Sequence, residues 1–178
     1  MDRRSGLFKA GEGLLALSLI GLLVALFQTW WTVHWIVPPI VQPPPVTING
    51  FSGWGWLSAA SWILLTVSLG RVLAAQIRHG SATRLEGKVL SVTTLVGGVI
   101  ELAGSLLHIA TAPRTHIAVP GQYVRIAAGP DIAIAYGLTI IASGILMFVA
   151  SRGWSPVQPL PADSDQLTAA GDRGGTDA

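Results

Sequence analysis

Cysteine is absent from the 178 residues of this chain, and charged residues are scarce. Without cysteine there can be no disulfide bonds, thiol nucleophiles, cysteine-type zinc sites or iron–sulfur clusters. Asp, Glu, Lys and Arg make up 11% of the residues, whereas an ordinary soluble domain has about 25%. Hydrophobic residues make up 51%, and the mean hydropathy is +0.57. This composition indicates a membrane protein before any segment is considered.

Motifs for catalysis and cofactor binding are missing as well. The sequence contains no nucleophile elbow, phosphate loop, H-E-x-x-H motif or dinucleotide fingerprint. Its four histidines do not have the spacing of metal ligands, and its few basic residues flank apolar segments instead of forming a patch. We therefore expect a protein that is not an enzyme, with no cofactor, no metal site and no nucleic-acid partner.

Four apolar segments are each long enough to cross a bilayer as a helix, which takes about 20 residues. They cover residues 13–33, 54–75, 89–110 and 131–151. The sequence thus predicts an all-α membrane protein, an antiparallel four-helix transmembrane bundle over residues 13–152. Residues 1–12 form a short N-terminal segment. The tail, 153–178, is rich in Pro, Gly, Asp and Ser, and is predicted to be disordered.

Lys and Arg are divided unequally between the two ends of this bundle. Only Arg114 and Arg125 of the 11 basic residues lie in the connections 34–53 and 111–130, and the other nine flank the opposite ends of the segments. Because positively charged flanks stay in the cytoplasm, both termini are predicted to be cytoplasmic. The chain is then a multi-pass protein of the plasma membrane with two outer loops.

The two outer loops have features of extended structure. Loop 34–53 contains five prolines, which forbid helix, and then Val46–Ile48 as a short strand before the turn Asn49-Gly50. Loop 111–130 alternates apolar and polar residues around Pro120-Gly121, as a half-buried hairpin does. Because an isolated hairpin is marginal in water, we expect both loops to pair into one small β-rich cap.

Glu101 lies about 12 residues into the third segment, close to the expected bilayer centre. A charged residue there costs roughly 2.5–3.5 kcal/mol on insertion scales, so we expect the carboxyl to be neutral. Ser105 and His108 share its helix face. Two interpretations stay open: a protonated acid that cross-links helices through hydrogen bonds, or a relay for protons or cations or a contact with a partner subunit. The expected neighbours at its depth are Ser61, Trp62, Thr139 and Ser143.

His108 and Asp131 are predicted to lie at similar heights near the outer ends of their segments. They have the right placement for a His–Asp pair. Asp131 also follows Gly129-Pro130, so it is equally explained as a helix-start residue that the helix dipole favours. Both interpretations are kept.

Tryptophan is concentrated in one part of the chain, where five of seven lie between positions 30 and 56. With the first segment leaving the membrane near Val33 and the second entering at Trp54, all five fall at the outer membrane–water boundary, which suits amphipathic rings. Trp31 and Trp54 either pack under the outer cap or line an opening that lipid enters.

Two tryptophan-containing elements resemble a known arrangement. They are LFQTWWTV (26–33) and FSGWGW (51–56). With the four-span layout, they make residues 10–152 resemble small, mostly uncharacterised four-span membrane proteins of high-GC Gram-positive bacteria. A fainter similarity is to claudin-like tetraspan proteins, in which an outer-loop tryptophan and a Gly-Leu-Trp element frame a small extracellular sheet. Trp31 and Gly53-Trp54 resemble these two elements. The paired cysteines of that group are absent, so the second resemblance implies topology alone.

Three functions compete on this evidence. The first is an accessory or assembly subunit that meets a membrane-protein partner, or a second copy of itself, through its helix faces and outer cap. The second is a small transporter or proton- or ion-conducting subunit that uses Glu101. The third is a lipid-binding or lipid-sensing protein. The predicted binding residues are Glu101, Ser105, His108, Asp131, Trp31 and Trp54, and the bilayer is the expected surrounding in every case.

Overall fold

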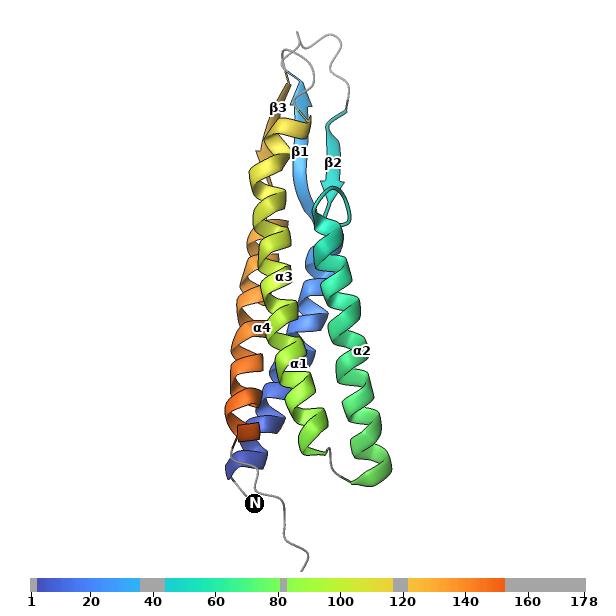
Figure 1. Ribbon diagram of the computed structural model, residues 1–178. Coiled ribbons are helices and arrows are strands. Elements are labelled where there is room, and N and C mark those ends of the chain that lie inside the picture. Colours follow the sequence, from blue (N-terminus) through green and yellow to red (C-terminus); the bar gives the residue numbers. More distant parts are fainter. Residues whose placement is uncertain (1–2, 36–43, 81–82, 117–121, 153–178) are drawn as a thin grey trace, which may run out of the picture.

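A long antiparallel helix bundle carries a small sheet at one end (Figure 1). The computed structural model describes residues 3–35, 44–80, 83–116 and 122–152. In chain order the elements are α1 (Arg3–Phe27), β1 (Thr29–Trp35), β2 (Val46–Asn49), α2 (Gly55–His79), α3 (Arg84–His116), β3 (Gln122–Ile126) and α4 (Gly129–Arg152). The start of α1, the end of α2 and the start of α3 lie at the end of the bundle opposite the sheet.

The four helices do not pack equally tightly. Helix α4 has extensive contacts with α1 and α3, α2 packs mainly on α3, and the α1–α2 contact is smaller. Two side-chain hydrogen bonds join α1 to α2: Trp62 Nε1 donates to Leu19 O at 2.8 Å, and Gln76 Nε2 donates to Glu12 Oε1 at 2.7 Å. The more loosely held face of α2 is therefore secured by polar contacts.

The bundle has apolar side chains outside and hydroxyl groups inside. Large apolar side chains are exposed along each helix, for example Leu17, Val67, Val99 and Val149 at 53% or more. The interior contains buried serine and threonine side chains on all four helices. Helices that meet in lipid associate through small and polar residues, since lipid is as apolar as leucine. All four are long and apolar enough to span a membrane, which confirms the predicted four long apolar helices.

The first predicted span, 13–33, is wrong at both ends. Helix α1 runs from Arg3 to Phe27, and TWWTVHW (Thr29–Trp35) is a β-strand. Apolar character alone cannot separate a helix end from a strand. The seven residues are all aromatic, β-branched or histidine, and aromatic and β-branched types favour strands. The segment is thus shifted toward the N-terminus, and its first turns contain the basic residues.

The other spans agree better with their predicted bounds. Helices α2 and α4 begin within two residues of the predicted starts. Helix α3 is longer at both ends than 89–110. Its start is a capping box that the sequence analysis missed: Thr83 N donates to Glu86 Oε2 at 2.7 Å, and Glu86 N donates to Thr83 Oγ1 at 3.3 Å. The predicted disordered tail, 153–178, lies outside the described residues.

The sheet contains strands from both predicted loops, but these strands do not pair with each other. The order is β2-β1-β3, and β1 pairs antiparallel with both neighbours. The Val46–Ile48 strand is confirmed and extends to Asn49. The hairpin predicted around Pro120-Gly121 is not fully described, because residues 117–121 lie outside the described part. Residues 111–116 of the predicted loop belong to α3.

Candidate functional site

Two adjacent tryptophans of the central strand are both buried. Side chains normally alternate across a strand, yet Trp30 and Trp31 are each 0% exposed. The pairing of β1 with β2 shifts register between Thr29 and Trp31, which leaves Trp30 as the extra residue of a bulge. A bulge re-aims a side chain, and here it lets both indole rings enter the junction of sheet and bundle.

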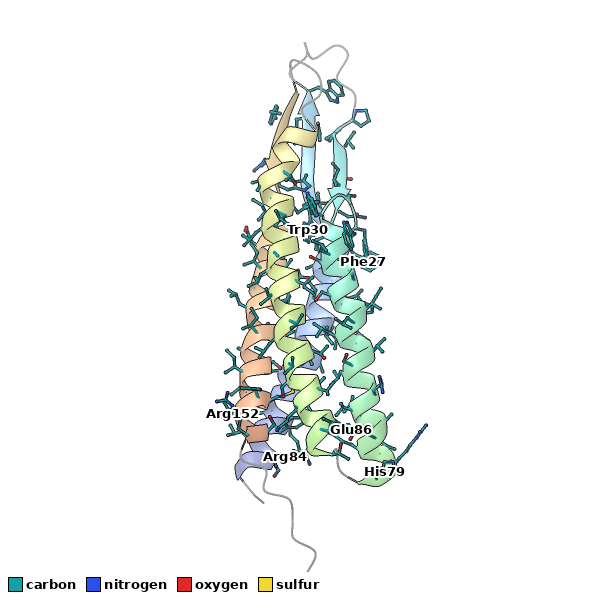
Figure 2. The ribbon with its side chains drawn as sticks, in the orientation of Figure 1. Phe27, Trp30, His79, Arg84, Glu86 and Arg152 are labelled. Atoms are coloured by element: carbon teal, nitrogen blue, oxygen red, sulfur yellow. The ribbon has the colours of Figure 1, made fainter. Side chains whose placement is uncertain are left out.

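Trp30 occupies a space that two glycines leave open. A Cβ atom placed on Gly50 would lie 2.7 Å from the indole ring, and one on Gly129 would lie 2.3 Å from it. Its Nε1 donates to Ala25 O at 2.8 Å, and Gly50 N donates to Leu26 O at 3.0 Å. Both acceptors are terminal carbonyls of α1, which have no partner within the helix. Trp30 and Gly50 therefore cap the end of α1, and Figure 2 shows Trp30 where the helices meet the sheet.

Trp31 connects the sheet to α3 through His108. Its Nε1 donates to His108 Nε2, and His108 is 2% exposed. The edge of Trp30 meets the same imidazole, with ring centroids 4.9 Å apart. Indole N–H is only a donor, so His108 Nε2 must carry a lone pair. We name Trp30, Trp31 and His108 the tryptophan–histidine junction; sequence reasoning had listed Trp31 and His108 without linking them.

Glu101 is enclosed between three helices. It is 0% exposed, and its Cγ lies against Gly137 of α4. Ser105 Oγ donates to Glu101 Oε1 at 3.0 Å, so these two predicted site residues are together. The side chain of Ser58, on α2, also lies close enough to the carboxyl group to interact with it. Enclosure of this kind leaves no contact between Glu101 and another subunit in this conformation.

The side chains expected to meet Glu101 have other partners in the structure. Ser61 Oγ donates to Gly97 O at 2.8 Å, and Ser143 Oγ donates to Gly11 O at 2.6 Å. Trp62 donates its hydrogen bond to Leu19 O of α1, and the Thr139 hydroxyl lies 2.9 Å from Ser18 Oγ. Counting depth from the predicted helix ends missed Ser58, because Gly53, just before α2, lies level with His108.

Asp131 lies in a different environment from His108. It is exposed and lines an open groove with Thr32, His34 and Arg125, whereas His108 is buried in the junction. On β1 and β3, His34 stacks on Tyr123 with ring centroids 5.0 Å apart, and Thr32 is paired with Arg125. These four side chains form the polar face of the sheet, which we call the groove face.

Trp54 differs from Trp31 in its exposure to the surroundings. Trp54 is 42% exposed at the start of α2, and Phe27 and Phe51, whose ring centroids are 5.1 Å apart, are exposed as well. Packing under the sheet thus describes Trp31 and does not describe Trp54. The exposed rings form an aromatic band at the sheet end, which suits a membrane–water boundary.

No protein-family model matches this sequence, and no curated protein matches it. The resemblance to small four-span proteins therefore stays a prediction. Among the described residues, no group of three His, Cys, Asp or Glu side chains is arranged to hold a metal ion. The chemistry that this arrangement offers is a buried carboxyl within the bundle and a polar groove at the sheet end that contains one basic side chain, Arg125, and one acidic side chain, Asp131.

Proposed function

We propose that this chain is a non-enzymatic, multi-pass membrane protein that acts as an accessory or assembly subunit. The observation that supports this best is the groove face at the end of the bundle. It presents the Arg125 guanidinium and the stacked His34–Tyr123 rings, a combination that is common at protein interfaces. Arg125 shares the groove with Asp131, so the proposed partner is a membrane protein with a polar segment near the membrane surface that offers an acidic group to Arg125.

The rigidity of this face supports the same proposal. Strand β1 carries His34 and Thr32 on one side, and Trp31 on the other side is bonded to α3. A surface held in one conformation loses less entropy on binding. A recognition face fixed to a bundle through buried tryptophans therefore suits stable association.

Site-specific photocrosslinking tests this function. A photoreactive residue at Tyr123 should give one discrete protein adduct in native membranes, and Arg125→Glu should reduce its yield at least about tenfold, as expected for loss of a buried charge contact. The matched control is the same probe at Val67, which is 58% exposed on α2 and should label lipid. Protein adducts equal at both positions, or none at Tyr123, would contradict the proposal.

A second candidate is a proton- or cation-conducting subunit, which Glu101 favours. An ionisable side chain inside a membrane span is costly and typically marks an ion or proton pathway. Glu101→Gln should abolish proton flux in proteoliposomes, while Glu86→Gln, a change at the exposed start of α3, should leave flux intact. Equal flux in wild type and Glu101→Gln would remove this candidate.

A further inference from the structure

Two buried polar atoms that face each other across α2 and α3 have no hydrogen-bond partner among the described residues. They are Glu101 Oε2 and Ser58 Oγ. Both residues are 0% exposed, and the Ser58 hydroxyl lies close enough to the Glu101 carboxyl to interact with it, although no direct hydrogen bond of good geometry joins them. Other buried hydroxyls of the bundle do have acceptors, as Ser61 and Ser143 show. Among the described residues, the other buried atom without a partner is Trp35 Nε1 on β1, so within the helix bundle the unpaired atoms are confined to this one place.

Buried polar atoms in native proteins are paired with protein groups or with ordered water. Ser105 uses only one oxygen of the carboxyl, Oε1. A single water molecule between Oε2 and Ser58 Oγ provides both a donor and an acceptor, which satisfies these two atoms together. The geometry thus points to a ligand of the size of water.

The surroundings of the carboxyl favour its neutral form. The facing groups are Ser58 on α2, Gly137 on α4 and Ser105 on α3, and no charged side chain of the described residues acts on it. Burial without a compensating charge disfavours an ionised group. A proton on Oε2 then has the bridging water as its acceptor.

We propose that Glu101 and Ser58 form a buried binding site for an exchangeable proton and one bridging water molecule. This proposal rests on the second candidate function and adds a binding site to it. Binding and conduction are tested separately, because a proton can bind without being conducted. Glu12, the other buried carboxyl of the described bundle, can be compared with Glu101 because it has the partners that Glu101 Oε2 lacks. Its carboxylate accepts a hydrogen bond from Gln76, and Lys9 acts on it electrostatically.

Labelling with dicyclohexylcarbodiimide tests the site, because carbodiimides add to protonated carboxyls in apolar surroundings. Intact-mass and peptide analysis of the purified full-length protein should show one adduct at Glu101, absent from Glu101→Gln. The yield at Glu101 should fall as the solution is made alkaline. An unlabelled Glu101, or a yield independent of pH, would overturn the proposal.

Variants of serine test the role of Ser58. Ser58→Ala removes the second anchor of the water and should move the pH at which half of the label is lost. Ser68→Ala is the matched control on α2, since the Ser68 hydroxyl bonds Leu64 O within its own helix. The same half-labelling pH in Ser58→Ala and Ser68→Ala would refute the two-residue site.

Infrared spectroscopy of the wild-type protein needs no variant. The C=O stretch of a protonated carboxylic acid should be present at neutral pH and disappear in alkaline solution. Its absence at neutral pH would contradict the proposal. If carbodiimide labels Glu101 but the protein shows no proton flux, the proposed binding site is supported and the proposed conduction is contradicted.

Discussion

At the scale of single residues, the junction depends on places where a side chain is missing. Gly50 and Gly129 face Trp30 from two sides, and a methyl group at either position would lie under 3 Å from the indole. Dense protein interiors respond to a change of one methylene. These glycines therefore determine whether the bulged tryptophan can enter the junction.

Gly129→Ala should lower the free energy of unfolding by about 1–3 kcal/mol, the usual cost of overpacking. Its added Cβ meets the Trp30 ring and also Thr29 O, a backbone atom that cannot easily move. Denaturation in detergent followed by circular dichroism measures this. Gly13→Ala is the control, because nothing lies within 4 Å of its new Cβ. If the two variants were equally stable, Trp30 would not be tightly enclosed.

At the scale of elements, a strand is attached to a helix through one side-chain hydrogen bond and the ring contacts around it. Trp31 lies on β1 and His108 on α3, 77 positions apart in the chain. The sheet has three short strands, of four, five and seven residues. Small sheets need packing against helices for stability, so this junction should control whether the sheet stays ordered.

Trp31→Phe keeps an aromatic ring but removes the N–H donor, and His108→Phe removes the acceptor. Each change should destabilise the protein by about 1–3 kcal/mol, the cost of a lost buried hydrogen-bond partner. The double variant should cost less than the sum, with a coupling of about 0.5–3 kcal/mol. Denaturation gives these energies, and hydrogen exchange should show faster exchange in β1 and β3. Additive losses would mean that the bond does not hold the sheet.

At the scale of the whole molecule, the two ends of the bundle differ in charge. Arg84 and Arg152 lie at the end opposite Trp30 (Figure 2). The sheet end has Arg125 as its basic side chain among those described. This asymmetry agrees with a bundle whose sheet faces outward, since positively charged flanks stay inside.

The absence of cysteine allows this orientation to be tested without background labelling. A membrane-impermeant maleimide should label Thr47→Cys, on β2, in intact spheroplasts of an expression host. It should label His79→Cys, at the end of α2, only after permeabilisation. Both positions are exposed, so access depends on the membrane alone. The reverse pattern would place the sheet in the cytoplasm.

Much of the fold is readable from local sequence properties. Hydropathy over about 20 residues predicted four long helices, and proline and alternation predicted extended structure near Val46 and Tyr123. The helix face of Glu101, Ser105 and His108 followed from helical periodicity. These features depend on residues close in the chain, which is why one sequence suffices for them.

Tertiary contacts decided the rest. TWWTVHW is apolar enough to end a membrane helix, and it becomes a strand because β2 and β3 supply backbone partners on both of its edges. Ser58 meets Glu101, and Trp31 meets His108, across distances in sequence that no local pattern encodes. The sequence by itself determined that the chain has four apolar helices and a carboxyl among them. The packing alone decided what that carboxyl and the tryptophans touch.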